Sequence, residues 1–334
     1  FGFTTLVDHE VIGDQVFTDI HQSLSLGGIT KGVKNIELNA AYATIANGGT
    51  YIEPKLYTKV VDQQGNVILD NTTPTSKQVI KETTAYLLTS AMEDVVTSGT
   101  GGSVNFGNMA IAGKTGTTSD YNDVWFAGFT PYYTATTWAG YDNNAKLKTS
   151  AEKNLAKTLW KSVMSKIHED LPYESFTMPS GIVQATVCSR SGKLPIAGLC
   201  DGTLKTEYFA EGTVPTASCD VHYQGNICEY SMLPACEECP FKISGTLELL
   251  PVEDISLQSG SATTVTNPDG TTTTAPVATT NMCPHNAEFF MQENAYNIID
   301  AQRAELENRR IAAQQQQWQE QQQQQQQQEQ QPTQ

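Results

Sequence analysis

Apolar residues recur with helical spacing in three segments of the first half of the chain. The first segment begins after Asn35, a candidate N-cap, and ends at Gly48-Gly49. The second covers about residues 83–96 and is followed by a cluster of glycines. The third covers about residues 153–168, and its apolar residues form one stripe: Leu155, Ala156, Leu159, Trp160, Val163, Met164 and Ile167. The pattern predicts three helices, the last of which covers a sheet.

Shorter apolar runs between these helices predict β-strands. Val60-Val61 and Val67-Ile68-Leu69 flank a Gln-Gln-Gly-Asn turn, which predicts a hairpin. Three further runs follow one another closely at residues 109–118, 124–130 and 133–141, and the last two are rich in aromatic and β-branched residues, as is typical of antiparallel strands. The order of helices, antiparallel strands and closing helix predicts an α+β fold, with an antiparallel sheet flanked by helices, over residues 1–172.

The composition changes after this first domain. Residues 178–258 are rich in cysteine, glycine and short strand-like runs, which predicts a small Cys-rich β module. Residues 259–285 have the Ser/Thr-rich composition of a linker. Residues 286–334 begin with a helical pattern and end in almost pure glutamine, so we expect this tail to pass from helical to disordered.

The chain is acidic, with 20 Lys and Arg residues against 36 Asp and Glu residues and a formal net charge of −16. This charge disfavours nucleic acid and anionic lipid as partners. No apolar run approaches the roughly 20 residues that a bilayer crossing needs. Because the chain begins at Phe1 rather than at a methionine, we expect it to be a fragment of a longer protein, with any membrane anchor in a preceding part.

The clearest chemical signal is Lys114-Thr115-Gly116-Thr117-Thr118, at the end of the first of the three close strands. An enzyme that opens an amide next to a free carboxylate needs a nucleophile, an oxyanion hole and a counter-charge for that carboxylate. Lys114 offers the counter-charge, Thr115 and Thr117 offer hydroxyl groups, and Gly116 allows a substrate backbone to approach closely. Alone, however, Lys-Thr-Gly is also common in surface turns.

Several ordered blocks around this motif carry a family resemblance: Ser25 to Gly28, Ala40 to Ala43, Ala46 to Gly49, Gly99 to Gly101, Ala112 to Thr118 and Asp123 to Thr130. Residues 1–170 resemble the C-terminal part of the transpeptidase domain of class A, or bifunctional, penicillin-binding proteins. The resemblance implies the fold shared by these transpeptidases and the serine β-lactamases. It also implies a catalytic role for Lys114 and substrate binding by Thr115, Gly116, Thr117 and Thr118.

The function implied by the resemblance is cross-linking of peptidoglycan stem peptides. Such an enzyme transfers an acyl group from a D-Ala-D-Ala terminus through an acyl-serine, and β-lactams acylate the same serine. The whole protein would also carry a glycosyltransferase domain and a membrane anchor, on the extracellular face of a bacterial membrane. No cofactor is expected.

Two alternatives remain open. A D,D-carboxypeptidase or β-lactamase would use water as the acyl acceptor, although a β-lactamase would end soon after the closing helix. A non-enzymatic wall-associated binding module would use its C-terminal region to recruit partners.

Two short patterns imitate the other motifs of this family. Ser150-Ala-Glu-Lys153 fits Ser-x-x-Lys, and Ser103-Val-Asn105 fits Ser-x-Asn. In the family both motifs precede the Lys-Thr-Gly strand by a long interval, whereas Ser150 follows it and Ser103 lies just before it. We therefore expect neither serine to be catalytic, and we expect the nucleophile to lie outside the chain, which alone would be inactive.

All seven cysteines lie between Cys188 and Cys283. The candidates for disulfide bonds or metal binding are Cys188, Cys200, Cys219, Cys228, Cys236 and Cys239. Cys188 and Cys200 flank a turn-rich stretch and form a natural disulfide pair. A denser group is a candidate zinc site, because Cys236-x-x-Cys239 has the spacing of zinc ligands; it consists of Cys219, His222, Cys228, Cys236 and Cys239. Because the implied location is extracellular, we favour disulfides and expect no metal. Because seven is an odd number, at least one cysteine is free, bound to a metal or paired with another chain.

Overall fold

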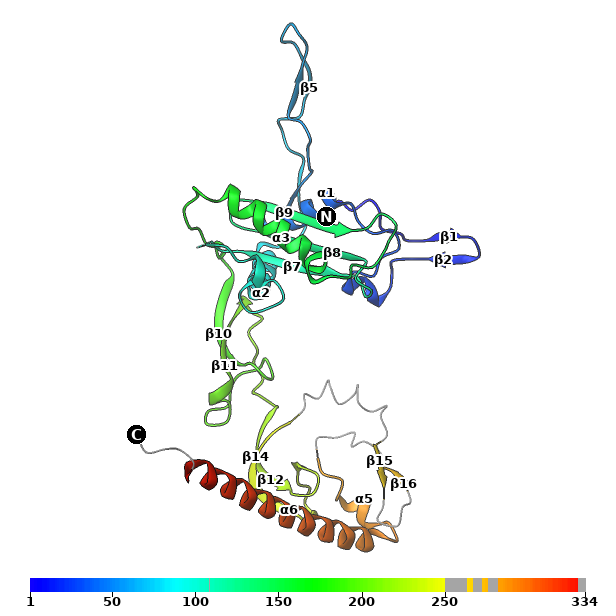
Figure 1. Ribbon diagram of the computed structural model, residues 1–334, viewed down its shortest axis with the longest axis vertical. Helices are drawn as coiled ribbons and strands as arrows, with labels where there is room; N and C mark the ends of the chain where they lie inside the picture. The colour runs from blue at the N-terminus through cyan, green and yellow to red at the C-terminus, as the bar shows by residue number, and fades with distance from the viewer. Residues whose placement is uncertain (108, 250–262, 267–271, 276–281, 330–334) are drawn as a thin grey trace. The chain divides into compact units, whose positions relative to one another are not determined.

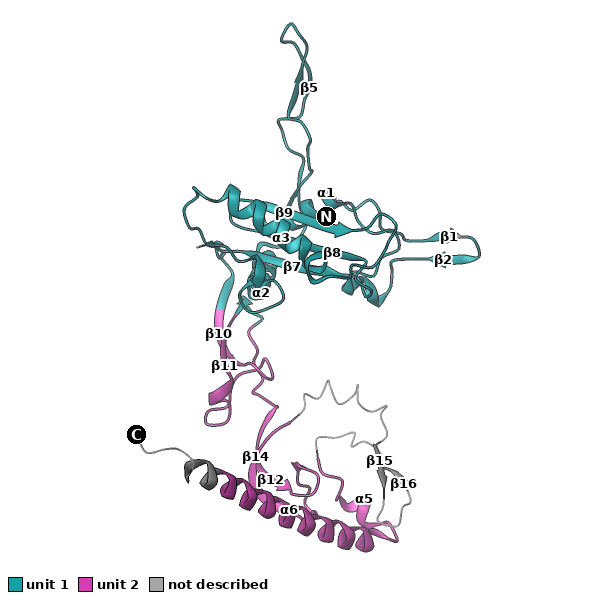
Figure 2. Ribbon diagram, viewed as in Figure 1, with its two compact units in different colours: residues 1–183, 208–213 teal, residues 184–207, 214–334 magenta. Residues whose placement is uncertain are grey.

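The computed structural model describes residues 1–107, 109–249, 263–266, 272–275 and 282–329. The chain divides into two compact units, formed by residues 1–183 with 208–213 and by residues 184–207 with 214–334 (Figure 2). Among the helices that these described ranges contain, none is both long enough and apolar enough to cross a bilayer.

A three-stranded antiparallel sheet lies at the centre of the first unit (Figure 1). Its strands, in spatial order, are β7 (Ala112–Thr117), β8 (Asp123–Phe129) and β9 (Thr134–Gly140). The central strand is buried on both faces, because Phe126 packs into one apolar cluster and Phe129 into another. Because β7 pairs with β8 and β8 with β9, both antiparallel, the predicted meander is confirmed.

Three helices cover this sheet: α1 (Asn35–Ala46), α2 (Glu82–Thr97) and α3 (Ser150–Ile167). Helix α3 packs on β8 and β9 from the Phe126 face, whereas α1 and α2 pack on the Phe129 face (Figure 1). All three predicted helices are therefore present.

Two local predictions about these helices need correction. Asn35 is the first residue of α1, and Lys34 occupies the N-cap position. The reason is that the Asn35 side-chain oxygen accepts a hydrogen bond from Thr136 of β9 and does not cap its own helix. The apolar stripe of α3 is also narrower than expected, since four of its members remain nearly half exposed: Leu155, Leu159, Val163 and Ile167.

The buried side of α3 is a line of residues four apart, formed by Ala156, Trp160 and Met164. Residues at this spacing lie one above another on a helix, so a narrow sheet can cover them and leave their neighbours in solvent. Trp160 is completely buried, with its ring centroid 5.0 Å from that of Phe126, and its Nε1–H donates to the carbonyl of Ala135 at 2.9 Å.

A capping box fixes the start of α3. The Thr149 hydroxyl accepts the N–H of Glu152 at 3.2 Å, and the Glu152 carboxylate accepts the N–H of Thr149 at 2.7 Å. The hydroxyl of Tyr141 donates to the same carboxylate at 2.6 Å. The N–H of Thr149, the hydroxyl of Tyr141 and further donors lower the pKa of Glu152 from its usual 4.5 to about 2.

We expect Glu152→Gln to reduce the loss of stability in acid. The folded-state pKa lies below the unfolded value, so Glu152 contributes stability above pH 4.5 that is lost as the pH falls toward about 2. Thermal unfolding of the two proteins across this pH range should show a steeper decline for the wild type. Glu169→Gln, at the other end of the helix, is the matched control. Parallel declines for wild type and Glu152→Gln would contradict the prediction.

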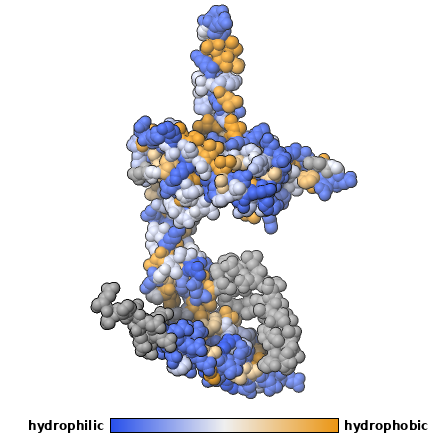
Figure 3. Space-filling model, in the orientation of Figure 1, coloured by the Kyte–Doolittle hydropathy of each residue, from blue (hydrophilic) through white to orange (hydrophobic). Residues whose placement is uncertain are grey.

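Short antiparallel strand pairs complete the first unit: β1 (Glu10–Ile12) with β2 (Gln15–Phe17), β3 (Thr50–Ile52) with β6 (Ser76–Gln78), and β4 (Lys59–Val61) with β5 (Val67–Asp70). The predicted hairpin corresponds to β4 and β5 and is confirmed. Its apolar side chains are exposed and form the orange patches of this hairpin in Figure 3: Val60, Val61, Val67, Ile68 and Leu69. Two 3₁₀ turns cover Gln22–Leu26 and Gly102–Val104.

The second half of the chain contains small sheets and a long helix. Strand β10 (Ile182–Cys188) pairs with β11 (Leu204–Ala210), and a further sheet has the order β13 (Leu233–Pro234), β12 (His222–Cys228), β14 (Lys242–Glu248). These strands support the β-rich character predicted for residues 178–258, of which residues 250–258 lie outside the described residues.

Within the predicted linker, β15 (Thr263–Thr266) pairs with β16 (Thr272–Ala275), and residues 259–262, 267–271 and 276–281 lie outside the described residues. Helices α5 (Ala287–Phe290) and α6 (Ala295–Glu329) follow. The predicted passage into disorder is not seen up to Glu329, because α6 continues through the glutamine run; residues 330–334 are not described.

Candidate active site

The Lys-Thr-Gly motif lies on an edge strand of the central sheet. Strand β7 pairs with β8 on one side, and no other strand among the described residues pairs with its second edge. Side chains alternate along a strand, so Thr115 and Thr117 lie on the α3 face, whereas Lys114 and Gly116 lie on the opposite face. The motif therefore presents polar groups on both sides of an edge whose backbone groups are available to a ligand.

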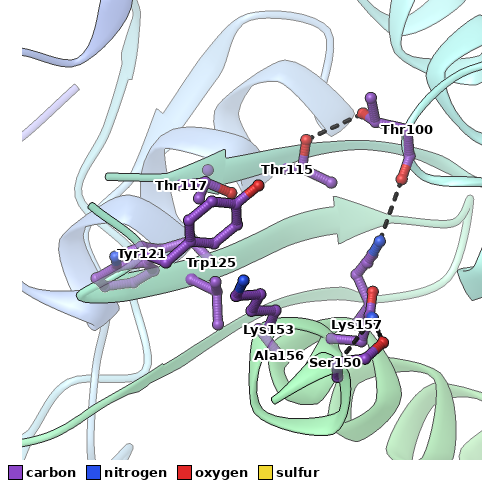
Figure 4. Close-up of a pocket in the computed structure, with 12 residues that line it drawn as sticks. Thr100, Thr115, Thr117, Tyr121, Trp125, Ser150, Lys153, Ala156 and Lys157 are labelled. Atoms are coloured by element: carbon purple, nitrogen blue, oxygen red, sulfur yellow. Dashed lines mark hydrogen bonds between the residues drawn. The ribbon is translucent and has the colours of Figure 1, made fainter. Parts of the chain in front are cut away.

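A cavity of about 500 Å³ adjoins the α3 face of this strand (Figure 4). It is lined by Thr100, Thr115, Gly116, Thr117, Tyr121, Val124, Trp125, Ser150, Lys153, Asn154, Ala156 and Lys157. None of these twelve residues, all of them described in the structure, is acidic, although the chain as a whole carries a net charge of −16. Two ammonium groups and several hydroxyls make this cavity suitable for an anionic ligand.

Hydrogen bonds connect the wall of the cavity to its neighbours. The hydroxyls of Thr115 and Thr100 lie 3.0 Å apart, which connects β7 to the loop after α2. Lys157 on α3 donates to the Thr100 carbonyl at 3.4 Å (Figure 4). Thr100 was not singled out by sequence reasoning beyond its place in a Gly-Thr-Gly block.

A side chain is excluded at Gly113 and restricted at Gly116, the two glycines of β7, by different neighbours. A Cβ at Gly113 would come within 2.6 Å of the Phe126 ring, so only glycine fits there without displacing the core. A Cβ at Gly116 would lie 3.1 Å from the Cβ of Trp125, a tight contact that requires a small shift. Glycine thus allows close packing of β7 on β8 and leaves the strand face at Gly116 flat.

The turn between β7 and β8 holds two residues whose roles sequence reasoning did not foresee. Tyr121 adopts a left-handed conformation with φ of 58°, which is uncommon outside glycine, and its ring lies 4.3 Å below the Lys153 ammonium. The hydroxyl of Thr118 accepts the N–H groups of Asn122 and Asp123 at 3.0 and 2.9 Å. Thr118, a predicted substrate-binding residue, therefore holds the turn, and it does not line the cavity.

The structure separates the five predicted motif residues into three groups, one of which is Thr118 alone, in the turn after β7. Thr115, Gly116 and Thr117 line the cavity. Lys114 is exposed on the opposite face, and its ammonium donates to the Thr115 carbonyl at 2.9 Å. A single ligand on the α3 face would therefore not meet all of them, whereas a ligand along the edge of β7 has both faces within reach.

Ser150 and Ser103, the serines of the two short motif-like patterns, lack the surroundings of a catalytic serine. Ser150 is the first residue of α3 and lines the cavity. The ammonium of Lys153 lies over the Tyr121 ring, and no hydrogen bond joins the two described residues Ser150 and Lys153. Ser103 lies in the 3₁₀ turn after α2, and its carbonyl accepts a bond from Lys161 at 3.2 Å. Neither serine has the adjacent base that activates a hydroxyl nucleophile.

The predicted disulfides are not present. All seven cysteines lie among the described residues, and all are free and buried. Cys188 and Cys200, the expected pair, meet Cys219 and His222, whereas Cys228 and Cys239 meet Cys283 and His285. Cys188 and Cys200 therefore lie together as predicted, whereas Cys239 is grouped with a distant segment at residues 283–285 and not with Cys236.

Comparison with known proteins assigns the first unit. Residues 8–165 match the family described as the penicillin-binding protein transpeptidase domain. Residues 8–165 belong to that family. Residues 178–224 match the C-terminal domain of penicillin-binding protein 1A. The resemblance predicted from the motif blocks is thereby confirmed.

Relatives of this penicillin-binding family agree with the assignment. Penicillin-binding protein 1A of Clostridium botulinum is 41% identical over 210 residues, which are 61% of this chain and 25% of that protein. Penicillin-binding protein 2D of Bacillus subtilis is 36% identical over 205 residues, which are 59% of this chain and 29% of that protein. The chain thus spans about a quarter of the length of these relatives.

A solved structure confirms the fold. The crystal structure of penicillin-binding protein 1A from Haemophilus influenzae superposes with a TM-score of 0.52 at 24% identity, covering 60% of this chain and 35% of that one. The α+β arrangement predicted for the first domain is therefore that of a penicillin-binding transpeptidase.

Proposed function

We propose that this chain supplies the Lys-Thr-Gly wall of a serine D,D-transpeptidase in a class A penicillin-binding protein, which cross-links peptidoglycan stem peptides. The observation that carries the proposal is the edge strand β7, which offers a free backbone edge, the ammonium of Lys114 on one face, and the hydroxyls of Thr115 and Thr117 on the other. Membership of residues 8–165 in a family named for binding penicillin supports it.

In this proposal the donor stem peptide lies along β7 in the manner of an added strand. Its backbone would form hydrogen bonds with the free edge of β7, and these bonds would position the peptide along the strand whatever its side chains are. Lys114 and the threonine hydroxyls would flank its terminal D-Ala carboxylate from the two faces, and Gly116 would permit close approach. β-Lactams, which carry a carboxylate beside a strained amide, would occupy the same position.

The reaction is acyl transfer in two steps. A serine oxygen attacks the carbonyl of the D-Ala-D-Ala amide, and the terminal D-Ala leaves as an amine after gaining a proton. An amine of a second stem peptide then attacks the ester, forms the cross-link and releases the serine. We place that serine outside these residues, since no Ser-x-x-Lys precedes Lys114 here and the relatives are several times longer.

We further propose that the whole protein carries a glycosyltransferase domain and a membrane anchor, and that the domain described here works on the extracellular face of the membrane. The match of residues 178–224 to the C-terminal domain of penicillin-binding protein 1A supports a synthase over a carboxypeptidase or β-lactamase.

We expect the full-length protein to form a covalent adduct with a fluorescent penicillin, and we expect this chain alone to form none. Ser150→Ala and Ser103→Ala should retain labelling in the full-length protein, because neither serine is the proposed nucleophile. Gel fluorescence after denaturation measures the adduct. Absence of label on folded full-length protein would refute the transpeptidase, whereas stoichiometric labelling of this chain would refute the external nucleophile.

A further inference from the structure

Three sulfur atoms converge on one histidine nitrogen in the second unit. The Nδ1 atom of His222 lies 3.4 Å from the sulfur of Cys188 and 3.3 Å from those of Cys200 and Cys219. The four donor atoms all lie within 4.8 Å of one another, and the three cysteines are buried.

Hydrogen bonding cannot account for this arrangement. A neutral imidazole Nδ1 either donates one hydrogen or accepts one, so it satisfies one thiol and not three. A tetrahedral zinc ion, with Zn–S near 2.3 Å and Zn–N near 2.0–2.1 Å, separates sulfur from nitrogen by about 3.6 Å. The three nearly equal distances at His222 fit one corner of such a tetrahedron.

A second cluster has the same composition. The Nδ1 atom of His285 lies 3.5 Å from the sulfur of Cys228 and 3.8 Å from that of Cys239, and Cys283 completes the set within 4.8 Å. His285 is completely buried, and its Nε2 lies 2.8 Å from the side-chain oxygen of Gln302 on α6.

The contact with Gln302 orients the ring of His285. When Nε2–H donates to the Gln302 oxygen, Nδ1 carries the lone pair that faces the three sulfurs. Metal-bound histidines commonly hold their second nitrogen in this way. The contact also links α6 to the cluster, with Ile299 and Leu306 of the same helix buried against it.

The two clusters are built by the same succession of elements. In each, the first cysteine ends a strand, β10 or β12, and a turn with Leu-Pro follows. Cys200 follows Pro195, and Cys239 follows Pro234, at the same interval. A strand comes next, β11 or β14, and the last two donors are a cysteine and a closely following histidine. Chance proximity of thiols would not reproduce this order twice.

This repeat also accounts for the odd number of cysteines. Two sets of three leave Cys236, which has no counterpart in the first cluster. Its sulfur donates to the carbonyl oxygen of His285 at 2.7 Å and lies 2.9 Å from the sulfur of Cys283, so Cys236 lies beside the second cluster and not in its set of four donors. A disulfide within either set would instead leave one unpaired buried thiol next to a histidine.

We propose that this module binds two zinc ions, one through Cys188, Cys200, Cys219 and His222 and one through Cys228, Cys239, Cys283 and His285. Zinc is the metal indicated, because closed tetrahedral sets of three cysteines and one histidine are typical structural zinc sites. Each ion would join strand ends and loops next to a small apolar cluster, which contains Val221 at the first site and Phe241, Ile299 and Leu306 at the second.

The test is metal analysis of the full 334-residue chain, purified with reductant and without chelator. We expect two zinc ions per chain by mass spectrometry, and an X-ray absorption spectrum with three sulfur ligands and one nitrogen ligand per zinc. Cys219→Ser and Cys239→Ser should each retain one zinc. Cys236→Ser, which keeps a hydroxyl donor for the His285 carbonyl, should retain two.

Two results would overturn the proposal. Less than one zinc per chain in the wild type, with cysteine pairs found oxidised by non-reducing peptide mapping of a parallel sample purified without reductant, would show disulfides in place of metal. Loss of one zinc in Cys236→Ser would refute the ligand set of the second site. The wild-type metal content and absorption spectrum decide the main question even where a variant fails to fold.

Discussion

Lys114→Met in the full-length protein is expected to slow acylation by penicillin by roughly 10²- to 10³-fold, the cost of deleting one preorganised electrostatic group from an acyl-transfer site. The ammonium of Lys114 lies at the edge of β7, where the proposed ligand presents its carboxylate. Methionine keeps the length of the side chain and removes the charge. Rates of adduct formation with a fluorescent penicillin, measured over time and concentration, give the second-order constant.

The matched control removes a lysine charge elsewhere in the same unit. Lys146 pairs with Asp120 at 3.4 Å, and both side chains are exposed. Lys146→Met should leave the acylation rate within about twofold of the wild type, because exposed ion pairs contribute little. Equal rates for Lys114→Met and Lys146→Met would remove Lys114 from the proposed site.

Trp160→Ala should produce the largest loss of stability among single changes in α3, about 3–5 kcal/mol in the free energy of unfolding. Trp160 is completely buried, packs on Phe126 and Phe106, and satisfies its indole N–H at the Ala135 carbonyl. Alanine would leave a cavity and an unpaired carbonyl in the centre of the first unit. Urea unfolding followed by circular dichroism measures the change.

Leu159→Ala is the control on the neighbouring residue of the same helix. Leu159 is 47% exposed, so its truncation removes little buried surface and should cost less than about 1 kcal/mol. A similar loss for the two variants would mean that the α3 stripe is buried as broadly as its sequence pattern predicts.

Local sequence patterns predicted most elements of the first unit. The hairpin of β4 and β5, the strands β7 to β9 and the three helices follow from short-range periodicity and turn residues, which act within about ten residues. Side-chain roles were less predictable where a partner comes from elsewhere. Asn35 does not cap its helix, because its side-chain oxygen accepts a hydrogen bond from Thr136, 101 positions further along the chain. The role of Thr118 depends on nearby residues, since its hydroxyl accepts the N–H groups of Asn122 and Asp123.

The partners of the cysteines were even harder to predict from local sequence. Spacing along the chain joined Cys188 to Cys200 and joined Cys236 to Cys239. The structure keeps Cys188 with Cys200, but it groups Cys239 with Cys228 and with Cys283 and His285, which lie beyond the Ser/Thr-rich segment. Disulfide and metal hypotheses depend on which sulfurs meet, and that depends on long-range contacts that spacing does not encode.

The sequence alone determined the family of the first unit and its motif strand, because blocks such as Ala112 to Thr118 are local and ordered. Only the tertiary structure decided how that motif is presented. Strand pairing makes β7 an edge, and alternation then places Lys114 opposite Thr115 and Thr117. It also decided that six of the seven cysteines form two clusters, each around one histidine. The reason is that the position of an edge and the partners of a thiol depend on contacts between distant segments, whereas a motif is continuous in the chain.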